Sequence, residues 1–194
     1  MPDSFLHHDP WNSRSEVLDG RFCFLGECES LGRPVDWAAP GTSLLWRFNL
    51  HYFHYVHLLS PAEQRALCRE WGAANPAGEG VGWHPYPTSL RLTNWCKARL
   101  SAPDLLERLY RQAAFLYRTV EGHVYGNHVL ENARALVLAG LYLRGQGEAD
   151  RWLERGLDLY RAESDEQILA DGVHYERSPM YHALMLEGYL DVLT

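Results

Sequence analysis

The sequence predicts an all-α protein built of antiparallel helical hairpins. From residue 43 onward, segments with a helical spacing of apolar residues follow one another, separated by turns rich in Gly, Pro and Asn. The pattern shows neither an alternation of strands and helices nor a short-period repeat. With 194 residues, 46% of them hydrophobic and 22% charged, the chain can bury a substantial core. We therefore expect about seven helices, each antiparallel to the next.

The first 42 residues lack this periodicity. They are rich in Gly, Pro, Asp and Ser, and they contain one short apolar patch at residues 21–25. Such a composition predicts an extended lead-in with one strand-like piece. We expect the lead-in, residues 1–42, to pack on a helical domain that spans residues 43–194.

Pro and Ser mark where several helices begin. The first helix is expected from Ser43 to Ser60, and Pro61 opens a second that ends near Ala74. A Gly- and Pro-rich loop over residues 75–82 follows. Further helices are expected over residues 89–100, 103–122, 127–143 and 148–169, and from 179 to the end. Because the last helix runs to the final residue without a Gly, a Pro or a polar tail, we expect the sequence to be a fragment.

Charge and hydropathy exclude some functions. A net charge of −7 and a pI of about 5.8 argue against a nucleic-acid partner bound by a general basic surface. No segment is long and apolar enough to cross a membrane, and the N-terminus lacks a basic stretch followed by an apolar run. The sequence thus predicts a cytoplasmic protein, or one whose export signal lies outside these residues.

The four cysteines are widely spaced. Cys23, Cys28, Cys68 and Cys96 form no CxxC pair and lie in no His-rich cluster with metal-ligand spacing. We expect free, mostly buried thiols, with a Cys23–Cys28 disulfide as the less favoured alternative. No metal site is expected in this chain.

The helix predicted from Asn127 opens with polar residues although the rest of it is apolar. Helical spacing places Asn127 and Glu131 on one side and His128 and Asn132 on an adjoining side. These groups must be satisfied by each other, by water or by a ligand. Taken alone, the pattern favours a helix cap, with Asn as the N-cap residue, over the floor of a site.

Two further polar clusters occur at predicted helix starts or in loops. If the helices alternate in direction, the N-termini of every second helix share one face, and the clusters could meet there. Their members are His84, Tyr86, Ser89, Arg91 and Asn94 in one cluster, and His174, Glu176, Arg177, Tyr181 and His182 in the other. Hydrogen-bonded or exposed histidines are favoured over metal ligands, because no HxxxH or HExxH pair occurs. Likewise, Trp83, Tyr86 and Trp95 are more typical of a core than of a sugar platform.

Tyr181 is the most informative residue of these clusters. With Ser178 as N-cap and Pro179 at the first helical position, Tyr181 occupies the third. There the helix dipole and neighbouring Arg177 favour the phenolate, whereas a tyrosine is otherwise a poor base with a reference pKa of about 10. An aromatic ring packed under a helix cap is the structural alternative.

Four motifs, in this order and spacing, resemble the heparinase II/III family of polysaccharide lyases, and in particular the N-terminal helical domain of the heparan-sulfate-lyase type. They are residues 45–53, 83–89, 126–133 and 171–182, and the likeness runs from about residue 21 to the end. The resemblance implies an incomplete (α/α) toroid followed by a C-terminal β-sandwich. It also implies β-elimination at a uronic-acid residue of an acidic polysaccharide.

The resemblance assigns roles to individual residues. Asn127 matches the residue that neutralises the uronate carboxylate, and Tyr181 matches the catalytic tyrosine that serves as general acid and base. The remaining candidates would bind substrate or orient these two; they are His128, Glu131, Arg91, Asn94, His84, Tyr86, Trp83, Arg177 and His182.

The resemblance also implies parts that these residues do not supply. The family uses a histidine, and often a divalent metal, from the β-sandwich, and its members are periplasmic. A polypeptide that ended at Thr194 would have little lyase activity. The few basic residues near the expected cleft, Arg91, Arg134 and Arg177, favour a substrate with little or no sulfate.

Two other functions fit parts of the pattern. A glycoside hydrolase could use Glu131 and Glu176 as its carboxylate pair and would give saturated products. A non-catalytic glycan-binding domain, or one associated with exopolysaccharide biosynthesis, would use the aromatic residues to bind sugar, while Asn127 and Tyr181 only cap helices.

Overall fold

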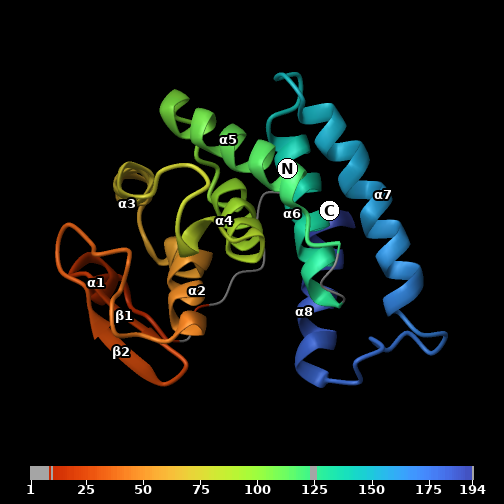
Figure 1. The fold of residues 1–194 in the computed structure, drawn as a ribbon, viewed down its shortest axis with the longest axis horizontal. Coiled ribbons are helices and arrows are strands. Elements are labelled where there is room, and N and C mark those ends of the chain that lie inside the picture. The colour runs from red at the N-terminus through yellow and green to blue at the C-terminus, as the bar shows by residue number, and fades with distance from the viewer. Residues whose placement is uncertain (1–8, 10, 123–125, 194) are drawn as a thin grey trace. The chain divides into compact units, whose positions relative to one another are not determined.

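The computed structural model describes residues 9, 11–122 and 126–193, which form eight α-helices and one two-stranded sheet (Figure 1). The chain divides into two compact units, one of residues 7–112 and one that includes residues 113–194. The boundary lies inside helix α5 (Pro103–Thr119). The seven predicted helical segments correspond to α2 through α8, so the helical fold is confirmed.

The lead-in contains more regular structure than predicted. After the short helix α1 (Arg14–Leu18), strands β1 (Arg21–Phe24) and β2 (Glu27–Ser30) pair as an antiparallel hairpin. Cys23 and Cys28 lie directly opposite each other in this hairpin and form a disulfide. The expectation of free thiols is therefore wrong for this pair, because the hairpin register brings the two side chains together. For Cys68 and Cys96 it is confirmed, since both are free and buried.

The hairpin is anchored to α2 (Leu44–Tyr52) through aromatic side chains. Phe24 is buried with its ring 5.1 Å from that of Trp46, edge to face. The Trp46 indole Nε1 donates a hydrogen bond of 3.1 Å to the carbonyl of Glu27. The lead-in thus contributes apolar side chains to the core around α2.

The first predicted helix is broken. Ser43 caps α2 by accepting a hydrogen bond from the Trp46 N–H at 3.2 Å, but the helix ends at Tyr52 because Phe53 has the left-handed φ of 64°. A separate 3₁₀ helix, η1 (His54–Leu58), follows. The Tyr55 hydroxyl donates to the carbonyl of Leu50, which satisfies a group that the interrupted helix leaves unpaired.

The remaining elements of this unit agree closely with the sequence pattern. Helix α3 (Pro61–Ala74) and α5 begin at proline, as predicted, and a 3₁₀ turn, η2 (Val81–Trp83), lies in the Gly-rich loop. Helix α4 (Pro85–Lys97) begins four residues earlier than expected. Its first residue is also a proline, whose fixed φ suits a first helical position.

A buried arginine lies at the centre of this unit. Arg91 of α4 is fully buried, with its guanidinium carbon 3.8 Å from the centre of the Trp71 ring. Its Nη1 donates to the carbonyl of Gly82 at 2.7 Å, and its Nε donates to the Gln112 side chain at 2.7 Å. Burial lowers the Arg91 pKa to about 9, since no carboxylate among the described residues pairs with it. Arg91 therefore ties the Gly-rich loop and α5 to α4.

His51 is held neutral beside this arginine. It is buried on α2, and its Nδ1 accepts a hydrogen bond of 3.0 Å from the Trp71 indole. Burial, and then the charge of Arg91, lower the His51 pKa to about 3.

The second unit contains three long helices. Helices α6 (Asn127–Tyr142) and α7 (Ala149–Gln167) lie side by side, and α8 (Pro179–Leu193) lies beside α6 (Figure 1). The close approach of α6 and α7 requires glycine at two positions. A Cβ on Gly140 would lie 2.7 Å from the backbone nitrogen of Leu153, and one on Gly156 would lie 2.9 Å from that of Val137.

Helix α8 is apolar on most of its surface. Its exposed side chains include Met180, Leu186 and Leu193. None of the described helices is both long and apolar enough to span a membrane.

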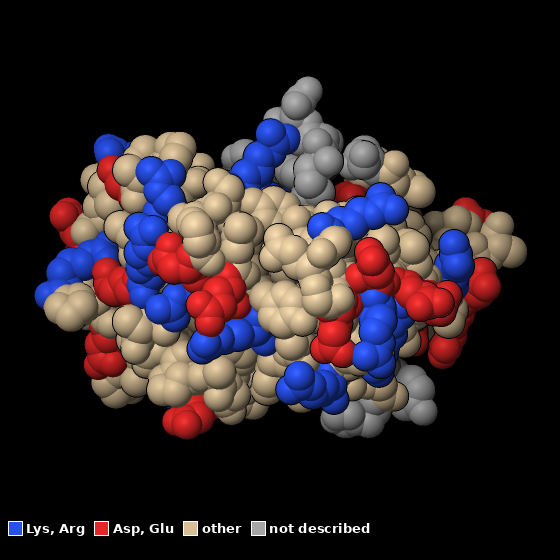
Figure 2. Space-filling model, turned by 90° about the horizontal axis from the view of Figure 1, so that it is seen from above, with Lys and Arg blue, Asp and Glu red and all other residues tan. Residues whose placement is uncertain are grey.

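Charged side chains of both signs are interspersed on the face shown in Figure 2. The exposed ion pairs of the protein include Arg69 with Asp104 and Arg111 with Glu107. Pairs of this kind contribute little to stability, because solvent screens them. The buried arginines are therefore expected to affect stability more than these exposed pairs do.

The pKa of His51 predicts how the stability of the protein depends on pH. Because the folded-state pKa of about 3 lies below the ordinary value of 6.5, the unfolded chain binds the proton first as the pH falls. The contribution of His51 is present above pH 6.5 and is lost as the pH falls toward 3. We expect His51→Asn, which keeps an acceptor for Trp71, to reduce the slope of unfolding free energy against pH by up to about 1.4 kcal/mol per pH unit between about pH 6 and 4.

Urea titrations at several pH values measure this slope. His84→Asn, at an exposed position, is the matched control and should leave the slope unchanged. Equal slopes for wild type and His51→Asn would contradict the assignment.

Candidate functional site

The two motifs that carry the predicted catalytic residues meet at Gly126. The Gln167 side chain, at the end of α7, donates from Nε2 to the Gly126 carbonyl at 2.9 Å. Its Oε1 lies 3.0 Å from Nε2 of the fully buried His174. A Cβ on Gly126, whose φ is 90°, would lie 3.0 Å from the Glu176 carboxylate. The segment that leads into α8 therefore lies against the residue that precedes Asn127.

Helices α6 and α8 run parallel, so their first turns lie at the same end (Figure 1). Leu130 of α6 packs in one apolar cluster with Met185 of α8. Further along both helices, four residues after Leu130 and six residues after Met185, Arg134 contacts Asp191. Asn127 lies one turn before Leu130, and Tyr181 lies one turn before Met185. The packing thus places the first turns that carry Asn127 and Tyr181 at corresponding levels of neighbouring helices.

The parallel register is fixed by a buried ion cluster around Arg134. Its Nη1 lies 3.2 Å from both oxygens of Glu131, and its Nη2 contacts Glu187 at 3.1 Å as well as Asp191. Only 3 to 6% of the side-chain surface of Arg134, Glu131 and Asp191 is exposed. Burial raises the pKa of Glu131, with Arg134 opposing the shift and the two other carboxylates adding to it.

This cluster changes the interpretation of Glu131. Because both of its oxygens accept from Arg134 and the residue is buried, the structure does not support a substrate contact. The same geometry removes one of the two carboxylates that a hydrolase would need, whereas Glu176 is exposed.

Glu121 contacts two other polar residues of α6, His128 and Asn132. Nδ1 of His128 lies 3.2 Å from the Glu121 carboxylate, and Oδ1 of the fully buried Asn132 accepts from the Glu121 N–H at 2.9 Å. Their predicted common side of the helix is therefore confirmed. The expectation that Asn127 caps the helix is wrong, because the cap position is Gly126 and Asn127 is the first helical residue. Asn127 and His128 are half-buried.

Tyr181 occupies the predicted third position of α8. The helix begins at Pro179, and the Tyr181 N–H donates to the Ser178 hydroxyl at 3.5 Å. The Tyr181 side chain is half-buried, and Arg177 is exposed with a left-handed φ of 53°.

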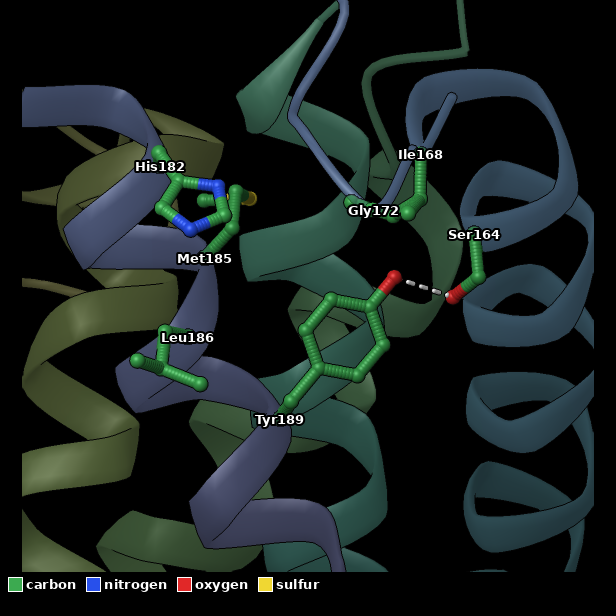
Figure 3. Close-up of a pocket in the computed structure, with 7 residues that line it drawn as sticks. All are labelled: Ser164, Ile168, Gly172, His182, Met185, Leu186 and Tyr189. Carbon is green, nitrogen blue, oxygen red and sulfur yellow. Dashed lines mark hydrogen bonds between the residues drawn. The ribbon is translucent and has the colours of Figure 1, made fainter. Parts of the chain in front are cut away.

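His182 lines a pocket of about 360 Å³ between α7 and α8 (Figure 3). Its Nδ1 is buried and has no hydrogen-bond partner among the described residues. Across the pocket the Tyr189 hydroxyl is 2.6 Å from the Ser164 hydroxyl. The remaining lining is mostly apolar and comprises Ile168, Gly172, Met185 and Leu186.

The predicted candidates of the first unit divide into buried and accessible residues. Arg91 and Trp83 are buried, and their polar atoms bind protein groups, so substrate contacts by these two are not supported. Asn94 is also buried, with Nδ2 donating to the Tyr52 carbonyl at 2.9 Å and Oδ1 lying 3.0 Å from His57 Nε2.

His84 and Tyr86 remain accessible. His84 is exposed, with its ring 5.2 Å from that of Phe48, and Tyr86 is half-buried with its ring 5.8 Å from that of Tyr52. Both stay predicted substrate contacts. Trp95 is fully buried, in agreement with the core interpretation.

The sequence pattern gave no role to Gln167, which links α7, Gly126 and His174. A glutamine near the end of an amphipathic helix is usually exposed, so the sequence does not predict that Gln167 is buried. Its role in linking these segments is visible only from its contacts. Among the residues that the structure describes, no group of three His, Cys, Asp or Glu side chains is arranged to hold a metal ion.

The sequence model of the Heparinase II/III N-terminus family matches residues 94–194, more than half of the chain. The chain belongs to the heparinase II/III family. The match includes helices α6, α7 and α8 and the segment that joins α7 to α8. It therefore covers both Asn127 and Tyr181.

Curated relatives of this heparinase II/III chain are much longer. The heparin-sulfate lyase of Pedobacter heparinus is 25% identical over 137 residues, which cover 62% of this chain and 20% of the relative. That of Bacteroides stercoris is 28% identical over 121 residues, which cover 58% and 18%. The chain thus spans about a fifth of the length of these relatives.

Solved structures share its fold. The heparan sulfate lyase HepC from Pedobacter heparinus superposes with a TM-score of 0.71 at 22% identity, over 92% of this chain and 32% of that one. A heparinase III with methylated lysines gives a TM-score of 0.73 at 19% identity, over 92% and 35%. These likenesses support the helical arrangement.

Removal of the Arg134 charge should separate α8 from α6. Arg134→Met leaves three carboxylates without their cation, and breaking a buried ion pair costs about 3–5 kcal/mol. We expect Arg134→Met to lower the free energy of unfolding by that amount, measured by chemical denaturation. Arg161→Met, which removes an exposed arginine of α7, should change it by less than about 1 kcal/mol. Equal effects of the two substitutions would contradict the cluster's role.

Proposed function

We propose that this chain forms the N-terminal part of a polysaccharide lyase that cleaves a uronic-acid-containing polysaccharide by β-elimination. In this proposal its helices are part of an incomplete (α/α) toroid, and a C-terminal β-sandwich completes the enzyme. Family membership and relatives named heparin-sulfate lyase support the proposal. The observation that carries it is the placement of Asn127 and Tyr181 in the first turns of two parallel, neighbouring helices.

Asn127 would neutralise the uronate carboxylate. Its amide can donate a hydrogen bond, and it stands at the N-terminus of a sixteen-residue helix, where backbone N–H groups and the helix dipole favour negative charge. When the C5 proton leaves, negative charge moves onto the carboxylate oxygens. A donor fixed at that position stabilises this charge more than the ground state, which is what accelerates the step.

Tyr181 would transfer protons in the same step. The C5–H bond breaks as a base accepts the proton, a double bond forms between C4 and C5, and the C4–O bond breaks. The leaving oxygen then takes a proton from a general acid, and no water is added to the product. A phenol at the third position of α8 can perform either transfer.

Other described residues would position these two. The Arg134 cluster sets the register of α6 and α8, and Gln167 joins Gly126 to His174. His128, held by Glu121, and His182, which faces the pocket, are further polar side chains in the first turns of the two helices. They would contact sugar hydroxyls, as would exposed Arg177.

The burial of two arginines favours a substrate with little sulfate. Arg91 and Arg134 bind protein groups in the interior, so only Arg177 of the three predicted arginines is exposed to solvent. Polysaccharide sulfates are usually bound by several accessible arginines or lysines. A histidine and a divalent metal would come from the β-sandwich.

Substitution of the two residues tests the proposal in the protein as its gene encodes it. Asn127→Ala should lower kcat by about 10²–10³-fold, the usual cost of one donor to a developing oxyanion. Tyr181→Phe should lower it by about 10²–10⁴-fold, the usual contribution of general acid–base catalysis. Turnover is followed by the ultraviolet absorbance of the unsaturated uronate product on an unsulfated glucuronate polymer.

Tyr117→Phe, at a half-buried tyrosine of α5, is the control and should retain full turnover. Saturated products would identify a hydrolase instead. Unchanged turnover in both variants would leave a glycan-binding domain as the better interpretation.

A further inference from the structure

A second cleft, of about 520 Å³, lies in the unit formed by residues 7–112. Three parts of the chain form its walls: the segment of residues 35–38, helix α2, and the loop of residues 74–81 after α3. Its volume lies within the usual range for small-ligand sites. None of the predicted site residues lines it.

Arg47 of α2 lines this cleft without a partner. Its Nε is buried and has no hydrogen bond, and no carboxylate within the described part of the chain forms an ion pair with it. Arg33, also partly buried in this unit, pairs with Glu70 instead. A half-buried guanidinium is costly unless something accepts its hydrogen bonds. An anionic group in the cleft would supply the missing acceptor.

The floor of the cleft is aromatic and neutral. Trp37 is 4% exposed, its ring stacks on Phe53 at 5.6 Å, and its indole N–H is buried without a partner among the described residues. His51, beside it, is held neutral by its burial, and its Nδ1 accepts a hydrogen bond from the Trp71 indole. An apolar floor lowers the local dielectric constant, which strengthens the attraction between Arg47 and an anion.

The rim of the cleft carries acceptors. Asp36 and Glu79 are exposed and line the opening, and neither forms an ion pair with Arg47. Two carboxylates repel a densely charged polyanion, whereas they accept hydrogen bonds from hydroxyl groups. The combination of one unpaired guanidinium, an aromatic floor and acceptors at the rim suits a ligand with one carboxylate and several hydroxyls per unit.

We propose that this cleft binds a uronate residue of an unsulfated acidic oligosaccharide. The Arg47 guanidinium would pair with the uronate carboxylate, and Asp36 and Glu79 would accept from sugar hydroxyls. The choice of a uronate rests on the proposed function, whereas the anion site itself rests on Arg47 and Trp37. The cleft would hold substrate in addition to any contacts made at Asn127 and Tyr181.

Binding of a defined oligosaccharide tests the proposal in the protein as encoded. The probe is an unsulfated tetrasaccharide of alternating glucuronate and N-acetylglucosamine, and its control has every carboxylate reduced to an alcohol. Titration calorimetry uses the Tyr181→Phe background, so that the probe is not consumed. We expect Arg47→Gln to weaken binding of the acidic probe at least about tenfold, as for the loss of a charged hydrogen bond, and Arg47→Lys to restore part of it.

The matched control is Arg14→Gln, which removes an exposed arginine of the same unit outside the cleft and should leave the affinity unchanged. Thermal unfolding of each variant shows whether it is folded. Hydrogen exchange gives the location: in the Tyr181→Phe background the acidic probe should protect residues 35–38 and 74–81, and this protection should vanish when Arg47→Gln is added.

Three outcomes would overturn the proposal: unchanged affinity in Arg47→Gln, equal binding of the reduced probe, or protection confined to other segments. These outcomes are separate from failure of the lyase proposal. If the encoded protein does not cleave the glucuronate polymer while Arg47→Gln still weakens binding, the lyase proposal fails and the cleft remains a uronate site. If Asn127→Ala and Tyr181→Phe lose turnover while Arg47→Gln binds normally, only the cleft proposal fails.

Discussion

The contact between Arg134 and Asp191 determines how the helices of the second unit can pack. The Arg134 guanidinium and the carboxylates of Glu131 and Asp191 are shielded from water, whereas Glu187 is partly exposed. The buried charges tolerate few arrangements, because each one moved away from its partners would be left buried and uncompensated. Sliding α8 along α6 by one turn would separate Asp191 from Arg134. The cluster therefore fixes the levels at which Asn127 and Tyr181 lie.

The unit of residues 7–112 is organised by a different kind of buried arginine. Arg91 has no carboxylate partner within the described part of the chain, and it is stabilised by carbonyl oxygens, the Gln112 amide and the face of Trp71. Burial disfavours the charged form of Arg91 and therefore lowers its pKa, and burial lowers the pKa of the neighbouring His51 in the same way. Arg91 and Arg134 would look alike in the sequence, as cations on helices with apolar residues around them. The partners that distinguish them lie far away along the chain: Glu187 and Asp191 are more than 50 residues from Arg134, and Gln112 is 21 residues from Arg91.

Local signals predicted the helices well. Prolines at first helical positions set the starts of α3, α5 and α8, and Ser178 with Pro179 placed Tyr181 at the third position of its helix. The motif from Asn127 to Asn132 also predicted a polar helix start. Its i, i+4 spacing predicted that His128 and Asn132 lie on one side of the helix, and both contact Glu121.

Features that depend on distant partners could not be predicted. The break at Phe53 arises from its buried ring and left-handed backbone, and the Cys23–Cys28 disulfide depends on a hairpin that the pattern did not reveal. Arginine and tryptophan are residue types that are common on binding surfaces, but the tertiary fold buries both Arg91 and Trp83. In the same way, the parallel register of α6 and α8 depends on a contact between Arg134 and Asp191, which are 57 residues apart.

The central claim is that Asn127 and Tyr181 act on the same uronate residue. A crystal structure of the encoded protein with Tyr181→Phe, soaked with an unsulfated glucuronate oligosaccharide, tests it most directly. The account predicts a uronate carboxylate within about 2.7–3.2 Å of the Asn127 amide nitrogen, with the ring of residue 181 facing the C4 oxygen of the same sugar. A well-ordered oligosaccharide whose carboxylates lie away from Asn127, or one that places the two residues on different sugars, would contradict it.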